Sequence, residues 1–231
     1  MWYNKNMQFE IYENLIKSDK FKEFYYILKE HNKMYNLTSI IEEKDAYLKH
    51  FLDSVVGEKY FFKGAKVIEI GSGGGFPSIP LKLIRDDLSF CLVESTLKKC
   101  NHLQQSVDKL GLKDVKVVNA RAEDLGKEVK YREKFDCVCA RAVARLNTLA
   151  EYCMPFIKIG GKFIAYKGDA KEEFEEAKKA IKVLGGEVEI FDEYDLPSGA
   201  GKRSIIVVKK VKNTPKEYPR GCGKERKRPI V

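Results

Sequence analysis

The first third of the chain carries apolar residues at helical spacing. Two helices are expected to open the protein, the second starting after a cap at Asp19. The apolar residues that define this second helix are Phe21, Phe24, Tyr25 and Leu28. A further helix is expected from Glu42 to about Asp53. Residues 1–60 are therefore predicted to form a helical N-terminal extension.

After residue 60 the pattern changes to short β-branched runs that alternate with helical stretches. Two of these stretches, Leu97–Leu110 and Leu146–Ile157, are amphipathic and long enough for right-handed crossovers. The runs are 67–70, 90–93, 115–118, 135–139, 163–166, 187–191 and 205–208. Alternation of this kind predicts an α/β domain over residues 61–211, with a seven-stranded, mainly parallel sheet.

The last two runs are connected differently. The link from Asp192 to Lys202 has no helical pattern and contains Pro197, Gly199 and Gly201. A loop of that composition joins antiparallel strands. We therefore expect an antiparallel pair at one edge of the sheet.

The net charge of +9 lies entirely at the C-terminal end. Eleven Lys and Arg and two acids follow Gly201, whereas residues 1–201 carry 32 of each sign. Residues 212–231 are rich in Pro and Gly and have no apolar periodicity, so they are predicted to form a basic, irregular tail. Its charge favours a polyanionic partner over a membrane, because no apolar face accompanies it.

The remaining composition excludes several classes of protein. No window approaches the ~20 apolar residues of a membrane span, and no apolar signal region follows Met1, so a cytoplasmic location is expected. The six cysteines include no Cys-x-x-Cys pair and are accompanied by only three histidines, so no metal site is expected. A monomer is expected because no long apolar stripe is left exposed.

A glycine-rich loop, Gly71-Ser72-Gly73-Gly74-Gly75-Phe76-Pro77, follows the first predicted strand. The third glycine of a dinucleotide fingerprint would fall at Phe76, and no Gly-Lys-Ser/Thr follows, so neither a dinucleotide site nor a P-loop is indicated. Three acids at strand ends are typical of proteins that bind S-adenosylmethionine. One lies two residues before the glycines, Glu94 follows the next strand, and Glu123 follows the third. Glu94 is placed to bind ribose hydroxyls, and Glu123 lies where such folds hold adenine.

At this point the sequence resembles the RsmG (GidB) family of 16S ribosomal RNA guanine-N7 methyltransferases. The resemblance covers nearly the whole chain and rests on Asn36-Leu37-Thr38, His50, Asp53-Ser54, Gly71 to Pro80, Arg121-Ala122-Glu123, Arg141-Ala142, Lys167-Gly168 and Tyr218-Pro219-Arg220. It implies a class I S-adenosylmethionine-dependent methyltransferase with a Rossmann-like fold. In the tail, Gly221-Cys222 and Glu225 depart from the family pattern.

The resemblance also implies a set of site residues and a substrate. The reaction is methyl transfer from S-adenosylmethionine to N7 of a guanine in 16S ribosomal RNA of the small subunit, with Arg141 as the catalytic residue. The expected cofactor-binding residues are Gly71, Gly73, Gly75, Phe76, Glu94, Ser95, Thr96, Ala122, Glu123 and Arg141. The expected RNA-binding residues are Arg121, Arg145, Lys167, Arg203 and Arg220.

Methyl transfer to guanine N7 requires little chemistry from these side chains. Guanine N7 has a lone pair and no proton to lose, so the reaction needs positioning and no general base. Cys139 is interpreted as a core residue because no base adjoins it, and His50 as a packed histidine. Three alternatives stay open: methylation of another RNA, methylation of a small molecule, and a non-catalytic RNA-binding assembly factor.

Overall fold

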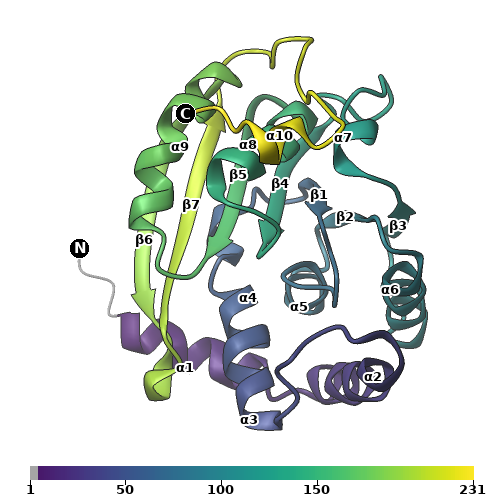
Figure 1. Ribbon diagram of the computed structural model, residues 1–231. Helices are drawn as coiled ribbons and strands as arrows, with labels where there is room; N and C mark the ends of the chain where they lie inside the picture. The colour runs from purple at the N-terminus through teal and green to yellow at the C-terminus, as the bar shows by residue number, and fades with distance from the viewer. Residues whose placement is uncertain (1–4) are drawn as a thin grey trace.

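A seven-stranded sheet forms the centre of the molecule, with helices on both faces (Figure 1). The computed structural model describes residues 5–231, with side chains from Phe9 onward; residues 1–4 of the expected N-terminal extension lie outside the described part. The strands are β1 (Lys66–Ile70), β2 (Ser89–Glu94), β3 (Val115–Asn119), β4 (Phe135–Arg141), β5 (Ile157–Lys167), β6 (Gly186–Asp195) and β7 (Lys202–Lys210). Each predicted run lies within one of them, so the strand prediction is confirmed.

The order of the strands is β3-β2-β1-β4-β5-β7-β6. The first five strands pair in parallel, and β7 runs antiparallel to both β5 and the edge strand β6, which confirms the predicted edge pair. Glu94 is in register with Asn119, and Arg141 with Tyr166. Residues that follow β1 to β5 therefore meet at one edge of the sheet.

Helices lie in each of the segments for which the sequence predicted one, within residues 5–231. They are α1 (Lys5–Leu15), α2 (Asp19–Tyr35), α3 (Glu43–Ala46), the π-helical η1 (Tyr47–Leu52), α4 (Asp53–Val55), η2 (Glu58–Tyr60), α5 (Ser78–Ile84), α6 (Leu97–Lys109), α7 (Ala122–Leu125), α8 (Leu146–Cys153), η3 (Met154–Phe156), α9 (Lys171–Val183), η4 (Pro197–Gly199) and α10 (Lys224–Lys227).

Three details of the helix prediction were wrong. Asp19 is the first residue of α2, and Ser18, in an extended conformation, is its N-cap. Helix α8 ends at Cys153, before the expected Ile157, because Pro155 has no N–H for a helical hydrogen bond and β5 begins at Ile157. The connection between β3 and β4 holds only the four-residue helix α7, which is too short to be the expected amphipathic crossover helix.

The two faces of the sheet are covered by different parts of the chain. The helices of the N-terminal extension share one core with α5 and α6, whereas α8 and α9 pack on the opposite face (Figure 1). Phe24 of α2 and Phe51 of η1 are both in ring contact with Phe76 of the glycine-rich loop, at centroid distances of 5.5 and 6.1 Å. The extension is therefore packed directly against the segment that follows β1.

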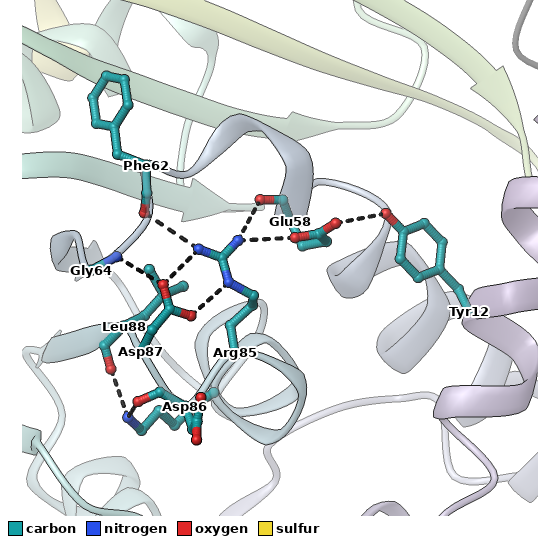
Figure 2. A network of polar contacts seen from close by, with 9 residues as sticks. Tyr12, Glu58, Phe62, Gly64, Arg85, Asp86, Asp87 and Leu88 are labelled. Carbon is teal, nitrogen blue, oxygen red and sulfur yellow. Dashed lines mark hydrogen bonds and ion pairs between the residues drawn. The ribbon is translucent and has the colours of Figure 1, made fainter.

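An ion-pair network fixes the extension at a second place (Figure 2). The Arg85 guanidinium donates to Glu58 at 2.9 Å and to both carboxylate oxygens of Asp87 at 2.7 and 2.9 Å. Glu58 in turn accepts from the hydroxyl of Tyr12 on α1. The Arg85 guanidinium holds the pKa of Asp87 well below its usual range. Charge-assisted, bidentate pairs of this type have defined geometry, so the network sets where α1 meets the body of the protein.

The basic tail is fixed to the body even though most of it has no regular secondary structure. The Arg132 guanidinium donates to the carbonyl oxygens of Thr214, Pro215 and Tyr218 at 2.7 to 3.1 Å. At the end of β7, the buried ammonium of Lys210 donates to the Met154 carbonyl and to the Thr214 hydroxyl. Part of the positive charge in this region is therefore bound internally and is not available to a partner.

Candidate functional site

The glycine-rich loop leaves the end of β1 in a conformation that requires glycine at two positions. Gly71 and Gly75 have φ values of +72° and +90°. A Cβ atom on Gly71 would lie 2.6 Å from Val143 Cγ2, and one on Gly75 would lie 2.4 Å from Ile79 Cδ1. Both the left-handed backbone and the close approach exclude side chains. The two glycines therefore let the loop pack closely, Gly71 against Val143 of the β4–α8 loop and Gly75 against Ile79 of α5.

Glu94 holds this loop from the end of β2. Its carboxylate accepts from the backbone N–H of Gly73 at 3.1 Å and from that of Thr96 at 2.8 Å. The side chain is 7% exposed. The Ser95 hydroxyl also donates to the carboxylate, at 3.5 Å. A carboxylate has about four lone-pair sites, so about one remains for another donor. Glu94 thus orders the loop and still has acceptor capacity.

A cavity of about 560 Å³ lies beside the loop. Five of the predicted site residues line it: Gly71, Ser95, Arg121, Ala122 and Glu123. They come from the segments after β1, β2 and β3, as the parallel register requires. Gly73, Gly75, Phe76, Glu94, Thr96 and Arg141 are not among the lining residues, and their predicted cofactor contacts stay predictions.

Nine residues that line this cavity were not predicted. Five of them lie within two residues of a predicted cofactor-binding residue: Ile70, Val93, Ala120, Asp124 and Val143. The other four do not: Tyr152, Cys222, Gly223 and Arg226. Tyr152 lies on α8, and the other three lie in the tail. Gly221-Cys222 departs from the family pattern, but no local sequence signal indicated that the tail returns to the carboxyl edge of the sheet.

Arg141, at the end of β4, is held from four directions. Its guanidinium donates to the Lys49 carbonyl at 3.2 Å, to Asp53 Oδ2 at 3.2 Å and to His50 Nδ1 at 3.0 Å. It also lies 4.8 Å above the centre of the Phe76 ring. A planar guanidinium fixed on its face and edges is pre-organised, so little entropy is lost when it binds a further group.

A second cavity, of about 370 Å³, surrounds Arg141. Lys167 and Arg203 line it together with Asp53 and His50. The residues Ala142 and Val143, adjacent in sequence, line the second and the first cavity respectively. The loop that follows β4 therefore lies between the two cavities.

His50 is neutral in this arrangement. Burial, together with the adjacent Arg141 guanidinium, lowers the pKa of His50 to about 3. Because Nδ1 accepts from Arg141, Nε2 carries the proton and donates to Thr38 Oγ1, 2.8 Å away. The ring is also stacked on Phe76 at a centroid distance of 4.4 Å. The interpretation of His50 as a packed histidine is confirmed.

Glu69, the acid two residues before Gly71, is fully buried in β1. Neither of its carboxyl oxygens has a hydrogen-bond partner among the residues the structure describes. Burial raises the pKa of Glu69 to about 7, against the smaller opposing effects of the nearby Ser72 and Ser78 hydroxyls and of Arg141. Glu69 thus lies beneath the loop as a half-protonated group at neutral pH.

The predicted RNA-binding residues differ in the contacts that they already make within the protein. Arg121 is exposed at the first cavity. Lys167 and Arg203 line the second, where Lys167 is paired with Glu173 at 2.6 Å and Arg203 with Asp53 at 3.4 Å. Arg145 is exposed and paired with Glu176, whereas Arg220 is bound by the buried Glu151 through three contacts of 2.6 to 3.2 Å. An RNA role for all five stays a prediction, and Arg220 in addition has a structural one.

The five buried cysteines offer no activated nucleophile, because burial raises the pKa of each thiol. Burial raises the pKa of the Cys139 thiol well above its usual range, which confirms it as a core residue. Cys91, Cys100, Cys137 and Cys153 are buried as well, whereas Cys222 is exposed. Over residues 5–231, no group of three or more His, Cys, Asp or Glu side chains could hold a metal ion, and no helix could cross a membrane.

Comparisons with solved structures show the fold. The chain is similar to M. jannaschii TYW2 in complex with AdoMet, with a TM-score of 0.56 at 14% identity over 74% of this chain and 77% of that one. It is also similar to a SAM-dependent methyltransferase from Aquifex aeolicus, with a TM-score of 0.54 at 17% identity over 78% and 97%. Together with the strand order, these likenesses confirm the predicted Rossmann-like methyltransferase fold.

Comparisons with sequences extend over nearly the whole chain. The protein is 47% identical to the ribosomal RNA small subunit methyltransferase G of Lactobacillus acidophilus, over 93% of this chain and 91% of that protein. It is 45% identical to the enzyme of the same name from Desulforamulus reducens, over 98% and 95%. The family model described as GidB, rRNA small subunit methyltransferase G, matches residues 17–205. The predicted resemblance is confirmed, and this chain belongs to the GidB family of rRNA small subunit methyltransferases.

Proposed function

We propose that this protein transfers a methyl group from S-adenosylmethionine to N7 of a guanine in 16S ribosomal RNA of the small subunit. The observation that supports the proposal most strongly is the pair of cavities on either side of the β4–α8 loop. One is bordered by the glycine-rich loop and suits a nucleoside cofactor. The other is lined by four cationic and two acidic side chains and suits part of a nucleic acid.

The residues of the first cavity fit S-adenosylmethionine. Gly71 lines the cavity without a side chain, so its backbone is open to a ligand there. Glu94 has acceptor capacity left for a ribose hydroxyl. Glu123 and Asp124 line the part of the cavity after β3, where the purine is expected, and their carboxylates can accept hydrogen bonds there. When bound, the cofactor supplies an electrophilic methyl group.

The chain's own contribution to the reaction is positioning. Arg141, held by Asp53 and His50, presents cationic donors at the second cavity, where they can bind guanine O6 or a backbone phosphate. His50 cannot take up a proton near neutral pH, since its pKa is about 3. This arrangement suits attack by N7, which loses no proton and therefore needs no base.

The three segments of the chain have different tasks in this proposal. Residues 61–211 hold the cofactor and carry Arg141, residues 1–60 support the glycine-rich loop through Phe24 and Phe51, and residues 212–231 present positive charge to RNA. The protein acts in the cytoplasm as a monomer.

The test is transfer of labelled methyl from S-adenosylmethionine to three substrates offered in parallel. These are small subunits from cells that lack this protein, small subunits from cells that contain it, and deproteinised 16S RNA. Label that enters the first substrate and not the second supports the proposal, and label in the third shows whether ribosomal proteins are needed. Absence of label from all three, with cofactor binding intact, would indicate a different acceptor or a non-catalytic role.

A further inference from the structure

The tail forms part of the first cavity. Cys222, Gly223 and Arg226 line it together with residues that follow β1, β2 and β3. Helix α10, which carries Arg226, packs against α8, and Figure 1 shows α10 (yellow) beside α8 and α7. The cavity is therefore bounded by the sheet edge on one side and by residues 222–226 on another.

Buried contacts hold this wall in place. Glu151 of α8, 1% exposed, accepts from both the backbone N–H and the guanidinium of Arg220, at 2.6 to 3.2 Å. One turn earlier on α8, the Thr148 hydroxyl donates to the Glu225 carbonyl at 3.0 Å. The Glu225 carboxylate, also buried, accepts from the Gly221 N–H. Since these groups lie on both sides of Cys222 and Gly223, the wall has a fixed position.

Arg226 reaches from this wall toward the β4–α8 loop. Its Nη2 donates to the Val143 carbonyl at 3.4 Å. Its charge also acts on Tyr152, as does that of Glu123. Arg226 thus contacts the β4–α8 loop and lines the same cavity as the segment after β3, where we expect the purine of the cofactor.

We propose that residues 222–226 of the tail are the outer wall of the cofactor cavity, with the Arg226 guanidinium covering the purine ring of the bound nucleoside. This inference rests on the proposed function, because it takes S-adenosylmethionine to be the ligand of that cavity. Guanidinium planes stack on aromatic faces, so an exposed arginine at this position stabilises a purine without being buried itself.

The first experiment uses Cys222 as a reporter, since the other five cysteines are buried. The rate at which N-ethylmaleimide alkylates Cys222 is measured by mass spectrometry with and without S-adenosylhomocysteine. At a concentration of about 100 times its Kd only about 1% of sites are free, so the rate should fall by about tenfold or more. An unchanged rate, with binding of S-adenosylhomocysteine shown by calorimetry, would overturn the inference and leave the proposed function standing.

The second experiment measures the affinity for S-adenosylhomocysteine in the absence of RNA. Arg226→Ala should raise the Kd by about tenfold. Lys227→Ala, which removes an exposed charge from the same helix outside the cavity lining, is the matched control and should leave the Kd unchanged. Equal Kd values for Arg226→Ala and the unaltered protein would overturn the role of Arg226. If the unaltered protein bound no cofactor at all, the proposed function and this inference would both be contradicted.

Discussion

Replacing Glu69 by glutamine should stabilise this protein at neutral and alkaline pH. The Glu69 carboxyl is fully buried without a hydrogen-bond partner in the described part of the chain, and burial raises its pKa from 4.5 to about 7. Above pH 7 the folded protein therefore holds a buried carboxylate whose interactions with Ser72, Ser78 and Arg141 do not offset its loss of hydration. Glutamine has nearly the same shape and carries no charge, so the variant does not have the free-energy cost of a buried carboxylate.

The magnitude follows from linkage between proton binding and folding. Between pH 4.5 and pH 7 the folded state binds a proton at Glu69 that the unfolded state has lost, so stability falls as pH rises through this window. Each pKa unit corresponds to about 1.4 kcal/mol. The free energy of unfolding of Glu69→Gln should thus exceed that of the unaltered protein by up to about 3 kcal/mol at pH 8, less the cost of burying an amide.

The assay is urea denaturation of both proteins at several pH values between 4.5 and 8. The quantity to compare is the difference in unfolding free energy between the two proteins at each pH. His50 and His102 have lowered pKa values, about 3 and about 4, so their stability contribution rises with pH, opposite to that of Glu69. Because both proteins contain these histidines, their contribution cancels in the difference. The stability difference should grow from near zero at pH 4.5 to its full value above pH 7. A difference that does not vary with pH would refute the assignment of a raised pKa to Glu69.

Further predictions concern the site and the tail. Glu94→Gln places an amide donor against the backbone N–H of Gly73 or Thr96. It should therefore raise the Kd for S-adenosylhomocysteine, measured by calorimetry, by about tenfold or more. An unchanged Kd would contradict the role of Glu94 in ordering the loop and binding the cofactor. Arg141→Lys keeps the charge but not the forked contacts to Asp53 and His50, and should lower the rate of methyl transfer by about 100-fold while the protein melts normally. A rate equal to that of the unaltered protein would remove Arg141 from the site. If the tail contacts about five phosphates, log Kd for RNA should rise by about 3 to 4 per decade of salt, as read by filter binding, and a slope near zero would exclude it from the RNA interface.

The sequence was sufficient to predict the strands, their mainly parallel arrangement and the antiparallel edge pair. These features follow from local periodicity and connection length, which are properties of contiguous segments. The places where Gly71, Ser95, Ala122 and Glu123 would meet could also be predicted, because parallel strands bring their carboxyl ends to one edge.

Other parts of the site depend on contacts between distant segments and had no local signal. The tail was expected to be irregular and to bind a polyanion, yet buried Glu151 holds Arg220 from 69 residues away in sequence. Likewise, nothing near Arg141 indicated that Lys49, His50 and Asp53 of the extension would fix its guanidinium. Contacts between residues so far apart in sequence can be identified only from the folded structure.

The most direct test of the proposed reaction is to locate the product on the RNA. Small subunits from cells that lack this protein are incubated with the purified protein and S-adenosylmethionine, and the 16S RNA is then treated with borohydride and aniline, which cleave at N7-methylguanine. The proposal predicts one new cleavage, at a guanine, that is absent when Arg141→Ala replaces the unaltered protein. Methyl incorporation without any new cleavage would place the methyl group on another atom and contradict the proposed reaction.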